Sequence, residues 1–330
     1  MMNSRWKRVP KAMLGGLVVV LAAVALEYPL ANLQRMPLDD AARQALIRSG
    51  DADHFVHLGL GTMHVREAGP QNGPVVLLVH GGVIGGYAWR QWQQPLTRAG
   101  FRVITPDLLG YGYSDRPKVP YTREFYTRQL TQLLDALKIV QPVHIVGASS
   151  GGAIVTAFAV DAPGRVRSVT LIAPAGGGRH SVVSDTLLLP VVGDWIFRVI
   201  GPRQVTGMME KAYPPSAERN ALVAWMRTQG SYRGFGEGLL NTLRNYDVLW
   251  QPEAYQALGR SGLPVLILWG TADTVNPFVQ SRQIVAWVPQ AQLMALPEKP
   301  HAITFGDAPL LLSHIQPFWK EHGSVQTDHR

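Results

Sequence analysis

The sequence predicts an α/β fold, in which helices cover both faces of a mostly parallel β-sheet. From His54 onward, short runs of apolar and β-branched residues alternate with amphipathic helical stretches, a pattern typical of this class. One run, PVVLLVH at residues 74–80, is apolar almost throughout, as expected for a strand buried on both faces. A chain of 330 residues, 46% of them hydrophobic, is long enough to enclose such a sheet in a sizeable core.

Eight strands are predicted along the chain. The first two form a pair around the glycines at residues 59–61, and most later strands are separated by helices. The strands are expected at residues 55–59, 62–69, 74–80, 101–107, 143–147, 166–174, 263–270 and 291–297. Thr122 is suited to cap a helix that runs to about Lys138, and a helix rich in small residues follows the fifth strand.

The alternation breaks between residues 176 and 259. This stretch is rich in Leu, Met, Trp and Tyr, contains helical runs such as AERNALVAWMRT, and is interrupted by glycines and prolines. We interpret residues 176–259 as a helical cap inserted into a sheet domain, which itself comprises residues 54–175 and 260–320. Residues 32–53 are expected to form a polar, partly helical connector to that domain.

Residues 1–31 are typical of a membrane anchor or an export signal. An uncharged stretch from Ala12 to Leu26 follows four basic residues, Arg5, Lys7, Arg8 and Lys11. A helix of this length reaches roughly 22 Å, which is marginal for the roughly 30 Å hydrocarbon core of a bilayer. A signal peptide cleaved after Ala25, which would release the protein to the periplasm or the medium, is the alternative. We favour the anchor because that cleavage site lies inside the apolar run, and the basic flank then places the folded domain on the non-cytoplasmic side.

Charge and composition exclude several classes of protein. The formal net charge is +8, but four of these charges lie in the N-terminal segment, and elsewhere basic and acidic residues are interleaved, so no nucleic-acid partner is expected. The chain has no cysteine, which excludes disulfides, thiolate zinc sites and a cysteine nucleophile. No convincing metal-ligand spacing occurs in the sequence, and we expect no metal.

The stretch VGASSGG contains a G-x-S-x-G pattern between a predicted strand and a predicted helix. A serine on so tight a turn needs small neighbours, and its hydroxyl is then exposed at the edge of the sheet. The register selects Ser149 as the nucleophile, because Ser150 would require glycine at position 148, where Ala148 stands. A purely structural turn of small residues is the alternative.

Two later strand ends supply the partners that a serine nucleophile needs. Asp273 follows the seventh strand and His301 follows the eighth, so the chain order is Ser, Asp, His. In parallel sheets, ligands bind outside the carboxyl ends of the strands, where these residues are expected to meet. Each has another possible role, since Asp273 could cap a helix after Pro277 and His301 could lie on a surface loop.

Two backbone N–H groups are candidates for binding an oxyanion. One belongs to Ser150, at the start of the helix after the nucleophile. The other belongs to Gly82, in the glycine-rich loop HGGVIGG that follows the third strand. A phosphate-binding loop is the alternative for this segment, but neither G-x-G-x-x-G nor G-K-[ST] occurs there.

Several motifs together resemble the α/β-hydrolase superfamily over about residues 55–319. They are HGG after an apolar strand, DLLGYGYSDRP, VGASSGG, PVLILWGTADTVNP and the late His301. The resemblance implies an eight-stranded, mostly parallel sheet with a helical cap, and it implies no cofactor. It also implies a Ser149 nucleophile, a His301 base, an Asp273 orienting acid and oxyanion donors at Gly82 and Ser150. Pro300 departs from the pattern, since many members have glycine before the histidine.

Among hydrolases of this fold, a carboxylesterase or lipase-like enzyme is the expected function. Ser149 disfavours haloalkane dehalogenases and epoxide hydrolases, which use Asp at this turn. Carbon–carbon hydrolases of aromatic ring-cleavage pathways resemble the chain, but they commonly carry Trp directly after the catalytic His, where this chain has Ala302. Such a hydrolase, an acyltransferase with the same triad and a catalytically silent binding module remain alternatives. The apolar cap favours apolar or lipid-like esters as small-molecule substrates.

Overall fold

An eight-stranded sheet forms the centre of the computed structural model, which describes residues 22, 24–50, 53–179, 184–213 and 215–322. The strand order is β1-β2-β4-β3-β5-β6-β7-β8. The strands are β1 (His54–Leu58), β2 (Gly61–Ala68), β3 (Val75–Val79), β4 (Arg102–Pro106), β5 (Val143–Ala148), β6 (Val166–Ile172), β7 (Val265–Gly270) and β8 (Gln292–Leu296). Each of them overlaps a segment predicted from the sequence.

The sheet is mostly parallel, which confirms the predicted fold class. Only β2 runs against its neighbours, pairing antiparallel with β1 and with β4, whereas β4, β3, β5, β6, β7 and β8 are all parallel. The carboxyl ends of β3, β5, β7 and β8 therefore lie along one edge, and each is followed by a loop that carries predicted site residues.

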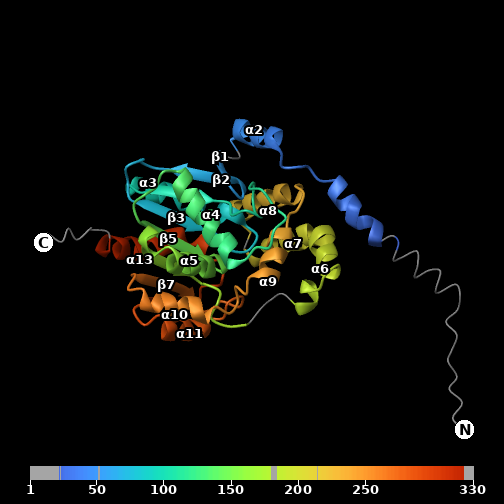
Figure 1. Cartoon of the computed structure of the whole chain (residues 1–330). Helices are drawn as coiled ribbons and strands as arrows, with labels where there is room; N and C mark the ends of the chain where they lie inside the picture. The colour runs from blue at the N-terminus through green and yellow to red at the C-terminus, as the bar shows by residue number, and fades with distance from the viewer. Residues whose placement is uncertain (1–21, 23, 51–52, 180–183, 214, 323–330) are drawn as a thin grey trace, which may run out of the picture.

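Helices cover both faces of the sheet (Figure 1). One face packs against α4 (Arg123–Ala136), α5 (Ser150–Asp161), α10 (Pro252–Arg260) and α11 (Gln280–Trp287), and the other against α3 (Gln93–Arg98) and α13 (Ala308–Glu321). Strand β3 shows why both faces are apolar. Its residues Val75, Leu77 and Val79 pack into the apolar cluster on the face covered by α4 and α5, and Val76 and Leu78 pack into the cluster on the face covered by α13.

A helical cap lies beside the sheet, at the right of Figure 1. It contains η3 (Asp185–Leu188), α6 (Val192–Trp195), the π-helical turn η4 (Ile196–Ile200), α7 (Gly201–Ala212), α8 (Ala217–Gly230) and α9 (Glu237–Asn245). The cap boundaries at residues 176 and 259 stay a prediction. The last helix of that stretch, α10, packs against α5 and α11 beside the sheet rather than against the cap helices.

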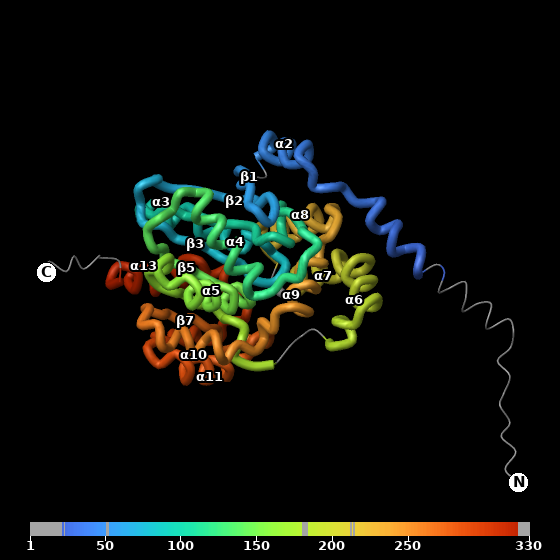
Figure 2. Tube along the Cα trace, viewed as in Figure 1, coloured from blue at the N-terminus to red at the C-terminus, as the bar shows by residue number. Residues whose placement is uncertain are grey.

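The helix of residues 24–33 lies beside the cap (Figure 2). Residues 24–33 are helical, and the indole Nε1 of Trp195 donates a hydrogen bond of 2.8 Å to the carbonyl of Val24. The helix α2 (Asp40–Ser49) follows. Most of the predicted apolar segment from Ala12 to Leu26 lies outside the described residues, and within them no helix is long and apolar enough to cross a membrane.

Candidate active site

Ser149 occupies a strained turn between β5 and α5. Its backbone has φ 53° and ψ −125°, a region that costs a non-glycine residue of order 1–3 kcal/mol. The turn is tight on both sides. A Cβ atom at Gly147 would lie 2.4 Å from the carbonyl oxygen of Gly151, and one at Gly151 would lie 2.6 Å from that of His80. The glycines are therefore required for the turn that presents the hydroxyl of Ser149.

The structure brings together the three residues predicted to act on the substrate. The Nε2 atom of His301 lies 3.1 Å from Oγ of Ser149, and its Nδ1 atom lies 2.7 Å from Oδ2 of Asp273. Because a carboxylate can only accept hydrogen bonds, Nδ1 carries the imidazole proton and Nε2 is left as an acceptor for the serine hydroxyl. The arrangement can therefore take a proton from Ser149.

Asp273 is fixed by its surroundings as well as by His301. Its side chain is fully buried, and Oδ1 accepts hydrogen bonds of 2.8 Å from the backbone N–H groups of both Val275 and Asn276. These bonds leave Oδ2 for the imidazole and prevent the carboxylate from rotating. The alternative role of Asp273, a cap on the helix after Pro277, is wrong, because that helix, α11, has Val279 at its N-cap and Asp273 instead binds the backbone of the turn at Val275 and Asn276.

The loops that carry Asp273 and His301 are tied to each other. The N–H of Ala272 donates to the carbonyl of Lys299 at 3.0 Å, and the N–H of Glu298 donates to Oγ1 of Thr271 at 2.9 Å. A Cβ atom at Gly270 would lie only 2.1 Å from the carbonyl oxygen of Lys299. The unusual proline before His301 is accommodated in this loop, and the imidazole still reaches Ser149.

The glycine-rich loop after β3 runs directly beside the serine turn. A Cβ atom at Gly81 would lie 2.3 Å from the carbonyl oxygen of Ala148, so only glycine permits this approach. Gly82, the predicted oxyanion donor, has φ 56°, and its N–H donates a hydrogen bond of 3.0 Å to the side-chain Oγ of Ser150. The two predicted oxyanion residues are therefore neighbours, but the contact between them involves a side chain that sequence reasoning did not use.

Asp107 is a buried residue whose function sequence reasoning missed. Its Oδ1 accepts from the N–H of Gly86 at 2.6 Å, and its Oδ2 accepts from Nδ1 of His64 at 2.8 Å and from the N–H of Tyr113 at 2.9 Å. Burial alone would raise the pKa of this carboxyl, but His64, together with His80 and the Tyr113 N–H, outweighs burial, and the pKa is lowered to about 2. Asp107 thus anchors the end of the glycine-rich loop. The motif DLLGYGYSDRP pointed to this position without indicating a role.

An aromatic wall joins the cap to the catalytic loops. The Tyr87 ring stacks on Trp225 of α8 with centroids 4.9 Å apart, and on Phe305, four residues after His301, at 5.9 Å. Tyr213, after α7, meets Phe305 edge-on at 5.4 Å. These rings belong to a cluster that also contains Val83 and Ile84 of the glycine-rich loop. The surroundings of the catalytic loops on the cap side are therefore apolar and aromatic.

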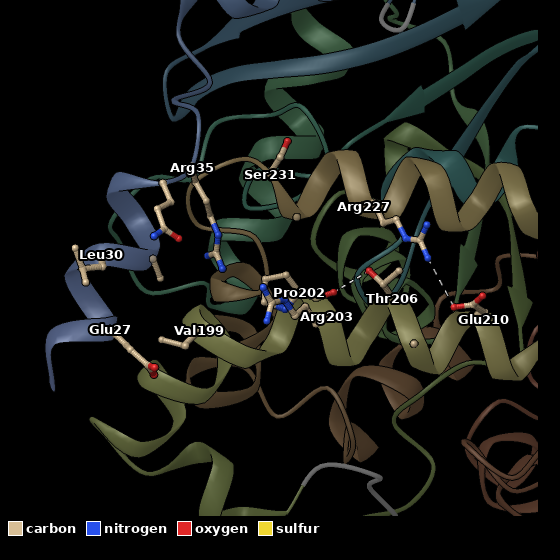
Figure 3. Close-up of a pocket in the computed structure, with 14 residues that line it drawn as sticks. Glu27, Leu30, Arg35, Val199, Pro202, Arg203, Thr206, Glu210, Arg227 and Ser231 are labelled. Atoms are coloured by element: carbon tan, nitrogen blue, oxygen red, sulfur yellow. Dashed lines mark hydrogen bonds and ion pairs between the residues drawn. The ribbon is translucent and has the colours of Figure 1, made fainter. Parts of the chain in front are cut away.

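A polar cavity of about 700 Å³ lies elsewhere, between the helix of residues 24–33 and the cap helices α7 and α8 (Figure 3). Its lining includes Glu27, Arg35, Arg203, Glu210 and Arg227. Ser149, Asp273 and His301 do not line this cavity. In the described part of the chain, no group of three or more acidic or histidine side chains is placed to hold a metal ion.

Comparison with known proteins identifies the family of the chain. A family model described as the alpha/beta hydrolase fold matches residues 74–308. The chain belongs to the α/β-hydrolase family. The match extends from β3, through the serine turn and the cap, to the loop beyond His301, and so it includes every predicted site residue of this hydrolase.

Two bacterial relatives are similar to this α/β-hydrolase over about two thirds of its length. The 2-hydroxy-6-oxo-2,4-heptadienoate hydrolase of Pseudomonas putida is 32% identical over 67% of the chain and 80% of its own length. The 2-hydroxymuconate semialdehyde hydrolase of Pseudomonas sp. strain CF600 is 31% identical over 66% of the chain and 77% of its own length. A thermophilic esterase from Thermogutta terrifontis superimposes with a TM-score of 0.67 and 21% identity, covering 82% and 99% of the two chains, which shows the shared fold.

Proposed function

We propose that this hydrolase cleaves carboxylic esters through a covalent acyl-enzyme on Ser149. The observation that carries the proposal is the continuous chain of hydrogen bonds from Oγ of Ser149, through the imidazole of His301, to the buried carboxylate of Asp273. A serine hydroxyl is a weak nucleophile unless a base removes its proton during attack, and this chain supplies the base and the group that orients it.

The reaction follows from the positions of these atoms. His301 Nε2 takes the proton of Ser149 as Oγ attacks the ester carbonyl carbon, and the carbonyl oxygen becomes an oxyanion beside Ser150 and Gly82. The protonated imidazole, held by Asp273, then donates its proton to the departing alcohol as the carbon–oxygen bond breaks. Water attacks the acyl-enzyme by the same sequence of steps, releases the carboxylic acid and restores Ser149.

The aromatic wall supports apolar or lipid-like esters as substrates. Tyr87, Trp225 and Phe305 present an apolar surface on the cap side of the catalytic loops, and such rings bind acyl chains or aromatic groups by burial of apolar area. The small Ala302 beside the base, where ring-cleavage hydrolases commonly have Trp, also favours an ester hydrolase.

Hydrolysis of a carbon–carbon bond in a ring-cleavage product is the second candidate. Two relatives at 31–32% identity are named for such substrates, and the same serine, histidine and aspartate could serve that reaction. In this architecture the cap determines the shape of the substrate site. The ester hydrolase and the carbon–carbon hydrolase would therefore differ in the substrates that the cap admits.

The two candidates are tested with one purified protein and its Ser149→Ala variant. We expect turnover of 4-nitrophenyl esters, rising from acetyl to longer acyl chains, and a loss of at least about 10⁴-fold in kcat for the variant. Equal rates for the two proteins would refute the proposed mechanism. Turnover of 2-hydroxy-6-oxo-dienoates without turnover of esters would establish the second candidate. Transfer of the acyl group to an added alcohol in preference to water would show an acyltransferase.

We also propose that the N-terminal segment holds the enzyme at a membrane, with the catalytic domain on the non-cytoplasmic side. The basic residues and the apolar run up to Leu26 support this, as does the exposure of Leu26 and Leu33, whose surfaces are 60% and 72% exposed. Fractionation and N-terminal sequencing of the mature protein test it. An intact N-terminus in alkali-washed membranes is expected, whereas a soluble protein that begins at Leu26 would show a cleaved signal peptide.

A further inference from the structure

The residue after the nucleophile carries a hydroxyl group that the mechanism above does not use. Ser150 is the first residue of α5, and its Oγ accepts the hydrogen bond of 3.0 Å from the N–H of Gly82. The Gly82 N–H, expected from the sequence to bind the oxyanion directly, is therefore directed to this side chain. Any oxyanion formed beside Ser149 must be bound with the Ser150 hydroxyl between it and Gly82, or after that hydroxyl has moved.

The Ser150 hydroxyl is able to donate its own proton. A serine hydroxyl has one O–H donor and two acceptor lone pairs, and the bond from Gly82 uses a lone pair. Among the hydrogen bonds of the described residues, none uses the Ser150 O–H as a donor. The side chain is only half-buried, so this proton can point toward the space in which a substrate carbonyl must lie.

The backbone of Ser150 faces the same space. The first N–H groups of a helix have no partner within the helix, and the N–H of Ser150 opens α5 directly after Ser149. The N–H and the O–H thus belong to the residue directly after the nucleophile, and the Gly82 N–H holds the hydroxyl oxygen. A hydroxyl that accepts a hydrogen bond becomes a better donor, because hydrogen bonds in a chain polarise one another.

We propose that the Ser150 hydroxyl is a catalytic residue, the second donor of the oxyanion site, and that it relays the Gly82 N–H to the oxyanion. In the tetrahedral intermediate the negatively charged oxygen accepts from the backbone N–H and from the side-chain O–H of Ser150, while Oγ keeps its bond from Gly82. No bond is broken at Ser150, and its proton stays on Oγ. This proposal rests on the proposed acyl transfer at Ser149.

A Ser150 hydroxyl that blocks the oxyanion site would predict the opposite change in rate when it is removed. If the Ser150 hydroxyl merely occupied the oxyanion site in the resting enzyme, it would have to leave before the Gly82 N–H could act, and its removal would speed the reaction. The sign of the effect of removing the hydroxyl therefore decides between the two arrangements.

The test compares the full-length protein with Ser150→Ala and with Ser150→Thr, which keeps a hydroxyl, on a 4-nitrophenyl ester. Removing one oxyanion donor typically lowers kcat by about 10²–10³-fold, and the freed Gly82 N–H recovers part of this. We therefore expect Ser150→Ala to lower kcat by about tenfold or more with little change in KM, and Ser150→Thr to restore kcat to within about threefold.

A transition-state analogue supplies the second measurement. A trifluoromethyl ketone forms a tetrahedral adduct with an oxyanion, so its inhibition constant should rise for Ser150→Ala by the same factor by which kcat/KM falls. A kcat for Ser150→Ala equal to or above that of the parent protein would overturn the proposal, as would an inhibition constant that does not change. Ser149→Ala separates this outcome from failure of the proposed function, because only the latter leaves Ser149→Ala active.

Discussion

The molecule contains two aspartate–histidine pairs of nearly the same geometry and of different consequence. In one, Asp273 Oδ2 lies 2.7 Å from Nδ1 of His301, and in the other, Asp107 Oδ2 lies 2.8 Å from Nδ1 of His64. Both carboxylates are buried, and both also accept two backbone N–H groups. The two pairs therefore share a buried aspartate, the distance from Oδ2 to the imidazole, and Nδ1 as the ring nitrogen that faces the carboxylate.

The two pairs differ at the second nitrogen of the imidazole. His301 has a side chain that is 21% exposed, and its Nε2 faces Ser149. The His64 side chain is 4% exposed, and its Nε2 is buried without a hydrogen-bond partner among the described residues. An aspartate–histidine pair can act as a base only where a nucleophile and a substrate can reach the second ring nitrogen, and only His301 meets this condition of the two. Elsewhere the same pair fixes backbone, here the glycine-rich loop through Gly86.

The two pairs should differ most in how far kcat falls when the aspartate of each is converted to asparagine. Asp273→Asn should lower kcat by about 10⁴-fold, because the amide favours the wrong imidazole tautomer while its oxygen can still accept from Val275 and Asn276. Asp107→Asn, the matched control, should lower kcat far less, by about tenfold, through a loosened glycine-rich loop. Steady-state kinetics on both variants measures this, and comparable losses in kcat would break the distinction between the pairs.

Stability should respond in the opposite order. Asp107→Asn places an amide N–H₂ among groups that donate to the carboxylate, so the free energy of unfolding should fall by about 3 kcal/mol. Asp273→Asn should cost about 1 kcal/mol, since a single donor, His301, faces the altered atom. Urea unfolding with an unchanged m-value gives both numbers. An Asp107→Asn variant as stable as the parent protein would show that this carboxylate does not anchor the loop.

Buried histidines outside the catalytic pair should make stability depend on pH. Burial lowers the pKa of both His80 and His144 to about 4. The unfolded chain binds protons at these residues below about pH 6.5, while the folded protein does not until about pH 4, so stability falls as the pH drops through this window. Each of these two histidines should lower the free energy of unfolding by up to about 3 kcal/mol as the pH falls from about 6.5 to about 4.

The contribution of His144 can be isolated because it lies in β5, where Nδ1 pairs with Oγ of Ser168 at 2.7 Å. In His144→Gln the melting temperature should fall less steeply between pH 6.5 and 4 than in the parent protein. Thermal unfolding at half-unit pH steps measures this, and parallel curves for the two proteins would contradict the assignment.

The smallest effect on kcat is expected from replacing the buried imidazole of His64. Asn at position 64 can place its amide near the position of Nδ1 and still donate to Asp107, so His64→Asn should cost about 1–2 kcal/mol, from lost ring packing against Phe55 and Tyr113. Its kcat should stay within about threefold of the parent value. His301→Asn, the same exchange in the other pair, removes Nε2 and should abolish turnover; a His64→Asn variant as inactive as His301→Asn would show that the pairs are not functionally distinct.

Much of this architecture could be predicted because its signals are local. The apolar run ending at Val79 and the small residues around Ser149 determine strand and turn directly, and parallel pairing brings the loops of Asp273 and His301 to one edge of the sheet. The order of Ser, Asp and His then sufficed to select three side chains that the structure brings together.

The missed features depend on contacts between distant segments. His64 lies on β2 and contacts Asp107, 43 residues later in the chain. No local sequence pattern around either residue predicts this contact. The contact of Trp195 with Val24 spans 171 residues and could not be anticipated from the composition of the cap. The bond from Gly82 to the Ser150 hydroxyl depends on a side-chain rotamer, which periodicity does not encode.

Trapping a covalent adduct on Ser149 is the most direct test of the proposed acyl-enzyme. The parent protein should react with an alkyl fluorophosphonate, whose phosphorus loses fluoride as Oγ attacks, to give one adduct, and peptide mass mapping should place it on Ser149. Asp273→Asn should react far more slowly and Asp107→Asn at a rate close to that of the parent. An adduct on another residue, or full esterase turnover in Ser149→Ala, would contradict the account.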